Sequence, residues 1–239
     1  MNRIALITGA SRGLGAALAR FLAGQRYDLL LTARDAGLLE AFARRLDGMG
    51  GRIAALAGDV ADPGHRQRLV ETAASLGGLD LLVNNASTLG PTPMPPLSEL
   101  PPVAIEDIFG VNVAAPLGLV QAALPLLEQR SGLVVNISSD AAIGGYPGWG
   151  GYGASKAALD LVSLTLANEL SGRGVGVVAV DPGDMRTEMH QAAYPGEDIS
   201  DRPTPEATLP FFAWLLGQEH VRISGRRYVA QAEKWELAA

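Results

Sequence analysis

Short apolar runs alternate with segments of helical periodicity along the whole chain. Apolar runs of this length, bounded by Gly, Pro, Asn or Asp, indicate strands. Many of the runs are apolar almost throughout rather than alternating, which is typical of strands covered by helices on both faces. The pattern predicts seven strands, at residues 3–8, 27–32, 52–57, 79–83, 133–137, 175–180 and 227–230.

Helical segments separate these strands. Apolar residues recur at helical spacing over residues 14–22, and Gly24 follows as a C-terminal stop. Residues 38–46 repeat the pattern. Asp62-Pro63 begins a third helix, because a capping carboxylate is followed by proline at the first helical position. This alternation predicts repeated βαβ units and a central parallel sheet.

Two apolar stretches imitate membrane signals. The N-terminal run is ended by Arg12 before the core of a signal peptide would be complete. Residues 109–127 carry no charge, but Asn112, Pro116 and Pro125 interrupt them. We therefore predict that this segment is a helix buried against protein and that the chain does not enter a membrane.

Two loops are longer than the others, at residues 88–102 with six prolines and at residues 188–205 with three. Loops of this length in a compact domain are usually functional. We expect residues 188–205 to form a substrate lid.

Composition narrows the class of protein. The 239 residues are 48% apolar, which is enough for one large core, and their formal net charge of −6 disfavours binding to nucleic acid or to an anionic membrane surface. The absence of cysteine excludes disulfides and thiolate chemistry and fits a reducing, cytoplasmic compartment. His65, His190 and His220 lie far apart in the sequence, so no metal site is predicted.

The first strand leads directly into the sequence TGASRGLG at residues 8–15, which opens the first helix. This is the context of a dinucleotide-binding loop. Gly9 can adopt a turn closed to residues with a Cβ, Gly13 lets backbone amides approach a pyrophosphate, and Gly15 allows close helix packing. A plain tight turn is the alternative. We predict an α/β Rossmann fold, a doubly wound parallel sheet of about seven strands with helices on both faces, in one domain spanning residues 1–239.

Tyr152 and Lys156 stand one turn apart at the start of a long apolar helix and share one face. An ammonium at about 4 Å from a phenol contributes roughly 4 kcal/mol at an effective dielectric of about 20, or about three pKa units. That would bring the pKa of Tyr152 close to neutrality, where a general acid or base works best. A solvated helical pair is the alternative interpretation.

Ser138 and Ser139 follow the strand at residues 133–137. Ligands of open α/β sheets bind beyond the carboxyl ends of the strands, so a hydroxyl at this place can hold a substrate oxygen. Serine is also common at strand ends because of its role in turns, which is the competing explanation.

Taken together, these segments resemble the short-chain dehydrogenase/reductases over nearly the whole chain. The resemblance rests on an ordered set of motifs, namely the loop at residues 8–15, Asp59-Val60 as the adenine-contact pair, Asn84-Asn85-Ala86 as the start of NNAG, Asn112, Ser139, Tyr152-x-x-x-Lys156, and Pro182-Gly183 through Thr187.

The resemblance implies hydride transfer between a nicotinamide and a carbonyl or alcohol carbon of a small molecule. Tyr152 would exchange the proton of the substrate oxygen, and Lys156 would lower the pKa of Tyr152 and hold the nicotinamide ribose. Ser139 would bind the substrate oxygen, and Asn112 would support a water that leads protons to solvent. The implied cofactor contacts are Gly9, Ser11, Arg12, Gly13, Leu14, Gly15, Arg34, Asp59, Val60, Asn85, Ala86, Tyr152, Lys156, Pro182, Gly183 and Thr187.

Two positions depart from the family pattern. Ser87 replaces the final glycine of NNAG, so either the backbone lies farther from the cofactor or the hydroxyl makes a new contact. Residues 223–230 lack the paired glycines that are common after the last strand, which bears on subunit contacts. The resemblance implies a homodimer or homotetramer formed through residues 112–127 and 152–170.

The end of the second strand bears on the choice of nicotinamide cofactor. Ala33 stands where relatives that prefer NAD usually place an acid, so the repulsion of a 2′-phosphate is missing. Arg34 and Arg12 can flank that phosphate, whereas Asp35 is expected to cap the next helix. We predict NADP(H) in preference to NAD(H).

The sequence predicts less about the substrate than about the cofactor. Tyr146, Trp149 and Met189 are candidate walls of its pocket. Two other functions stay open: a module that senses NADP without catalysis, and a nucleotide-sugar epimerase or dehydratase. Retention of both Tyr152 and Lys156 disfavours the former, and the short C-terminal region disfavours the latter.

Overall fold

A seven-stranded parallel sheet forms the centre of the computed structural model, which describes residues 2–236. The strand order is β3-β2-β1-β4-β5-β6-β7, and every neighbouring pair is parallel. The predicted doubly wound Rossmann fold is confirmed. The strands are β1 (Ile4–Thr8), β2 (Asp28–Thr32), β3 (Ile53–Ala55), β4 (Leu81–Asn84), β5 (Leu133–Ile137), β6 (Gly176–Asp181) and β7 (Arg227–Val229).

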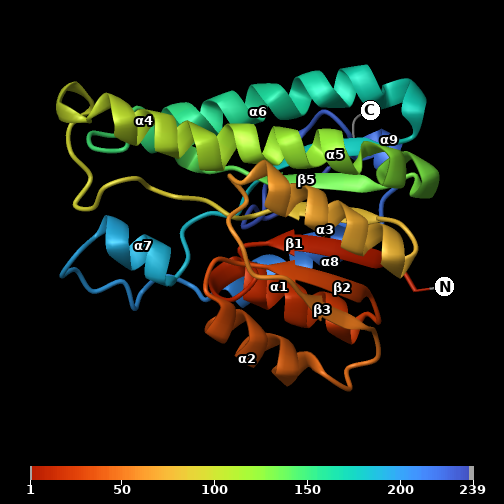
Figure 1. Ribbon diagram of the computed structural model, residues 1–239. Coiled ribbons are helices and arrows are strands. Elements are labelled where there is room, and N and C mark those ends of the chain that lie inside the picture. The colour runs from red at the N-terminus through yellow and green to blue at the C-terminus, as the bar shows by residue number, and fades with distance from the viewer. Residues whose placement is uncertain (1, 237–239) are drawn as a thin grey trace.

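Helices cover both faces of this sheet, as Figure 1 shows. One apolar core lies between the sheet and the helices α1 (Gly13–Gly24), α2 (Ala36–Leu46) and α8 (Leu209–Leu215). A second core lies between the other face and the helices α3 (Pro63–Leu76), α5 (Ala115–Arg130) and α6 (Gly150–Leu170). Five of the seven strands are buried along their full length, because both of their faces are covered.

The predicted helix boundaries follow from their caps. Asp35 accepts a hydrogen bond from the backbone of Leu38 at 2.9 Å and begins α2. Asp62 caps α3, with Pro63 as its first residue, as the sequence predicts. Gly24 is the last residue of α1, but the left-handed residue that closes this helix is Arg26, with φ of 62°.

The loop at residues 188–205 begins with a helix that the sequence did not predict. Thr187 caps α7 (Glu188–Ala193) by accepting a hydrogen bond from the backbone of His190 at 3.1 Å. The other long loop contains the short 3₁₀ turn η1 (Leu97–Glu99). A second short helix, α9 (His220–Ile223), precedes β7.

The long apolar segment is helical from Pro102 to Arg130, as α4 (Pro102–Phe109), the π-helical turn η2 (Gly110–Ala114) and α5. Within the described chain it is long and apolar enough to cross a membrane, with a mean hydropathy of 1.6 over 18 residues. Only 33% of that window is buried, so the prediction of a helix buried against protein is correct for one side of the helix only.

A chain of buried amides ties the strands to the helix that carries the site. Asn84 in β4 donates from Nδ2 to Oδ1 of Asn136 in β5 at 2.8 Å. Asn136 in turn donates to the hydroxyl of Ser163 in α6 at 2.8 Å. These contacts hold the register between β4, β5 and α6 in the core.

We expect the Asn136→Ala variant to lose about 1–3 kcal/mol in free energy of unfolding, because the buried amide of Asn84 loses its acceptor. Urea denaturation measures this difference. The exposed Asn168→Ala on the same helix as Ser163 is the control and should stay within about 0.5 kcal/mol of the parent chain. Equal stability of the two variants would contradict the role of this chain of amides.

Candidate functional site

The carboxyl ends of the central strands open into one cavity of about 700 Å³. This is the edge at which ligands of open α/β sheets bind. All of the predicted cofactor contacts except Gly15 line the cavity, as do Ser139, Tyr152 and Lys156. Gly15 and Asn112 do not line it, and each lies directly behind a residue that does.

The glycine loop is shaped for a ligand that approaches backbone. Gly9 and Gly13 have φ of 65° and 55°, a left-handed conformation that favours glycine. A Cβ on Gly15 would lie 2.3 Å from the carbonyl oxygen of Gly9, so only glycine allows α1 to start this close to the loop. The N-terminal residues of α1 line the cavity, and backbone amides at a helix start attract phosphate. The residues present therefore fit a dinucleotide.

Thr8 and Asn85 fasten the glycine loop to the end of β4. The Thr8 hydroxyl accepts hydrogen bonds from the backbone of Asn85 and Ala86, both at 2.9 Å. The Asn85 side chain donates back to the carbonyls of Thr8 at 2.8 Å and Gly9 at 3.2 Å. These four hydrogen bonds tie the glycine loop to the end of β4.

Tyr152 and Lys156 occupy the first turns of α6 and are 8% and 2% exposed. The Lys156 ammonium donates to the carbonyl of Ile137, the last residue of β5, at 2.7 Å. Its Nζ lies 5.5 Å from the centroid of the Tyr152 ring. The predicted pairing of these residues on one helix face is present, with the ammonium held by the end of a strand.

The sequence predicts that Lys156 lowers the pKa of Tyr152 toward neutrality. For the residues of the protein by themselves, that prediction is wrong. Burial raises the pKa of Tyr152 well above its ordinary value, and the hydroxyls of Ser139 and Ser87 lower it only in part. Asp181 and Asp140 raise this pKa further. Burial also lowers the pKa of Lys156 to about 8, opposed by the carboxylate of Asp160. The cost of burying charge thus outweighs the attraction that the spacing predicts.

Asn112 lies in the π-helical turn η2 and is completely buried. Its Oδ1 accepts from the Ser87 hydroxyl at 3.1 Å and the Thr88 amide at 2.9 Å. Its Nδ2 donates to the Thr88 carbonyl and to the Ser155 hydroxyl, both at 2.9 Å. An amide side chain offers two donors and two acceptor lone pairs, and all four are in use. The side chain therefore has no free group for the water that the family resemblance implies.

Ser139 directs its hydroxyl toward the cavity beyond β5. It donates to the carboxylate of Asp140 at 3.0 Å and accepts from the backbone of Ala141 at 3.2 Å. It lines the same cavity as Tyr152, and it lowers the pKa of that phenol. The neighbouring Ser138 hydroxyl is buried and has no partner within residues 2–236. Ser139, rather than Ser138, is thus the serine whose hydroxyl acts on Tyr152.

Asp181 and Arg227 were not predicted as parts of the site. Arg227 in β7 donates to Asp181 at 3.1 Å, to Asp160 at 2.9 Å and to the carbonyl of Ser139 at 2.8 Å. One guanidinium therefore joins the ends of β5 and β6 to α6. The position of Asp181 at the carboxyl end of a strand is the sequence signal that could have identified it.

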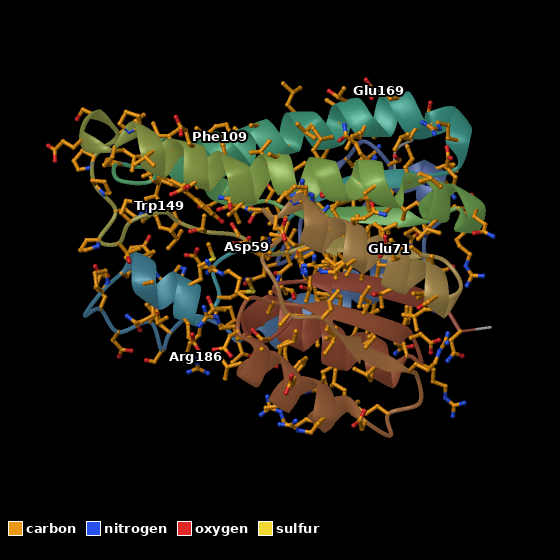
Figure 2. The ribbon with its side chains drawn as sticks, viewed as in Figure 1. Asp59, Glu71, Phe109, Trp149, Glu169 and Arg186 are labelled. Carbon is orange, nitrogen blue, oxygen red and sulfur yellow. The ribbon has the colours of Figure 1, made fainter. Side chains whose placement is uncertain are left out.

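An apolar wall closes the cavity on the side of α7. Trp149 packs edge-on against Tyr152 with ring centroids 5.7 Å apart, and Tyr194 lies 5.9 Å from Trp149. Leu89 and Met189 complete this apolar wall. Trp149 and Met189 were predicted as walls of the pocket and line the cavity, whereas Tyr146, also predicted as a wall, is 48% exposed and does not line it. Leu89 lines the cavity and was not predicted. Figure 2 shows Trp149 between α7 and the helices α4 and α6.

The charged groups around the lid are mostly paired. Arg12 of the glycine loop forms an ion pair with Glu188 at the start of α7. Oδ2 of Asp184 lies 3.5 Å from Nε of Arg202, and Oδ1 of Asp184 lies 3.9 Å from Nδ1 of His190. Arg34 is exposed at the end of β2 and lines the cavity beside Ala33. Both arginines predicted near a 2′-phosphate thus lie at the cavity.

Known proteins share this sequence and fold. The sequence model of the family described as short chain dehydrogenase matches residues 3–198. The oxidoreductase YciK of Escherichia coli is 34% identical over 237 residues, which is 96% of this chain and 92% of YciK. The 3-oxoacyl-[acyl-carrier-protein] reductase FabG of Staphylococcus epidermidis is 32% identical over 89% of this chain and 86% of its own.

Solved structures agree with these relatives. A short chain dehydrogenase from Shigella flexneri, complexed with NADP, has a TM-score of 0.89 and 32% identity, and the match covers 97% of this chain and 98% of that one. A short chain dehydrogenase from Escherichia coli, complexed with NADPH, has the same TM-score at 33% identity and the same coverage. The chain therefore belongs to the short-chain dehydrogenase family and is an oxidoreductase acting on the CH–OH/C=O pair.

Proposed function

We propose that the protein is an NADP(H)-dependent oxidoreductase that transfers a hydride between the nicotinamide and the carbonyl or secondary alcohol carbon of a small molecule. The observation that carries the proposal is the buried Tyr152 side chain, which lines the same cavity as Ser139 and lies one helical turn from Lys156. A phenol and a second hydroxyl facing the same space are the groups that a reacting carbonyl oxygen needs.

In this proposal the nicotinamide supplies or accepts the hydride when it is bound. Tyr152 gives its proton to the substrate oxygen in reduction and takes it back in oxidation. Ser139 donates a hydrogen bond to the same oxygen, for which it leaves Asp140. Lys156 places a positive charge beneath the phenol and stabilises the phenolate that forms. Asn112 holds the loop at residues 87–88 in place.

The preference for NADP(H) rests on the end of β2. Ala33 leaves the cavity without an acid at that position, and Arg34 and Arg12 both line it. A guanidinium binds phosphate through paired hydrogen bonds. The similar structures from Shigella flexneri and Escherichia coli were solved with NADP and NADPH.

The lid and the subunit contacts belong to the same proposal. Residues 188–205, with α7 at their start, cover the apolar end of the cavity. Leu161 and Leu164 of α6 are 65% and 45% exposed, and only 33% of the most apolar window of the helical segment Pro102–Arg130 is buried. We infer that these faces meet in a homodimer or homotetramer, because large exposed apolar patches usually mark contact surfaces.

The substrate end of the cavity favours an uncharged carbonyl compound. Its walls are apolar, and Asp140 places a carboxylate beside the Ser139 hydroxyl. A substrate carboxylate bound near Ser139 would meet this like charge.

The Tyr152→Phe variant is expected to lose at least about 100-fold in kcat, because the proton donor is removed. NADPH consumption with ethyl acetoacetate or 1-phenyl-1,2-propanedione measures the rate, and NADPH binding should stay within about twofold. The exposed Tyr146→Phe is the control. Full turnover by Tyr152→Phe would refute the mechanism, and binding without any turnover by the parent chain would favour a sensing module.

We expect Arg34→Asp to lower the ratio of kcat/KM for NADPH over NADH by about tenfold or more, because a carboxylate repels the 2′-phosphate. Arg44→Asp, on the exposed side of α2, is the matched control. An unchanged ratio in Arg34→Asp would show that this residue does not select the cofactor.

Neutralising Asp140 tests the preference for uncharged substrates. In Asp140→Asn, kcat/KM for acetoacetate should rise by about threefold to tenfold relative to its ethyl ester, because a like charge is removed near the substrate. Asp198→Asn, in the outer part of the lid, serves as the comparison. If the two variants give the same ratio of acid to ester, Asp140 does not act as a charge filter.

A further inference from the structure

Arg227 in β7 binds three acceptors that belong to three other parts of the fold. Its Nη2 donates to the carbonyl oxygen of Ser139 at 2.8 Å and to Oδ2 of Asp181 at 3.1 Å. Its Nε donates to Oδ2 of Asp160 in α6 at 2.9 Å. Only 24% of the Arg227 side chain is exposed, so water and salt screen these contacts little. Because the guanidinium is planar and rigid, it fixes the three acceptors relative to one another.

This guanidinium continues the connection between β5 and β6 beyond their backbone pairing. The amide of Ser138 donates to the carbonyl of Val180 at 2.7 Å. One residue further along each strand, Ser139 and Asp181 are joined through a single nitrogen, Nη2 of Arg227. The separation of these two residues therefore depends on a side chain from a third strand.

Asp181 extends the connection into the loop that follows β6. Its Oδ1 accepts a hydrogen bond from the amide of Gly183 at 2.9 Å, while its Oδ2 is held by Arg227. Pro182 and Gly183 line the cavity and are among the proposed cofactor contacts. The cofactor side of the cavity is therefore tied to the same guanidinium as Ser139.

The separation of these two sides matters for the proposed reaction. Ser139 would bind the substrate oxygen, and the loop at residues 182–183 would contact the cofactor, so their spacing sets the distance that the hydride crosses. In reduction the carbonyl carbon gains the hydride, and its oxygen gains the proton of Tyr152. A misplacement of about 1 Å can slow such a step by about 100-fold.

We propose, on the basis of the proposed function, that Arg227 is a positioning residue that holds Ser139 and the loop after β6 at the separation that hydride transfer requires. Arg227 does not line the cavity, so it acts through the groups that it binds. Its bond to Asp160 anchors the guanidinium to α6, the helix that carries Tyr152 and Lys156. One side chain thus relates the substrate side, the cofactor side and the proton donor.

The test replaces the rigid fork by a compact ammonium of the same charge, in Arg227→Lys. We expect kcat for the reduction of 1-phenyl-1,2-propanedione by NADPH to fall by about tenfold or more, because the reacting atoms are misplaced. The KM for the diketone and the Kd for NADPH should stay within about threefold. With NADPH deuterated at the transferred position, the isotope effect on kcat should be at least as large as in the parent chain.

Arg226→Lys makes the same chemical change one position earlier and is the matched control, with kcat expected within about twofold of the parent chain. Full kcat in Arg227→Lys would show that the residue only balances charge and would overturn the proposal. A loss confined to KM or to the Kd for NADPH would overturn it too, because that result describes binding and not the placement of the reacting atoms.

Amide hydrogen exchange provides a second readout that needs no turnover. In Arg227→Lys the amide of Gly183 should exchange about tenfold faster, because its acceptor Asp181 loses its anchor. The amide of Leu30, in the buried centre of β2, is the internal reference and should not change. Unchanged exchange at Gly183 would contradict the role of Arg227. Faster exchange in a chain that reduces no carbonyl compound would instead count against the proposed function alone.

Discussion

The register between β1 and β4 is the constraint on which the cavity depends. It is fixed at the ends of the two strands, where one threonine hydroxyl serves two backbone amides and the Asn85 side chain returns two hydrogen bonds. These short contacts place the glycine loop against the end of β4 and start α1 at the floor of the cavity. A slip of one residue would point every side chain of β1 to the opposite face, so the core and the loop support the same register.

Around Tyr152 and Lys156 a different constraint acts, because charged side chains are buried there and each is stabilised by a hydrogen bond with a fixed part of the fold. Lys156 is held by a strand carbonyl, and Asp181 by Arg227. Burial alone would leave the phenol neutral and the ammonium easily deprotonated. The chemistry that we propose therefore depends on few polar groups, each placed by a different element of the fold, and small changes in their geometry have large effects on the proton affinity of Tyr152.

Much of the fold could be predicted because periodicity and caps are local properties of the sequence. All seven strands were placed to within two residues at each end, although β3 is shorter than predicted. Helix α7 was missed because six residues are too few for a readable period. The pKa of Tyr152 was mispredicted because the spacing of Tyr152 and Lys156 gives their proximity but not their burial. Arg227 is remote in sequence from the residues that it joins. NADP preference, oligomerisation and cytoplasmic location stay predictions.

The two outer strands of the sheet, β3 and β7, are three residues long. A free strand edge presents unpaired backbone groups that can template another chain, and short edges limit this risk. The sheet therefore has longer strands at its centre, and its two edges offer few backbone groups to which another strand could pair. The association between copies proposed above would then rest on side chains of the helices rather than on backbone pairing at a strand edge.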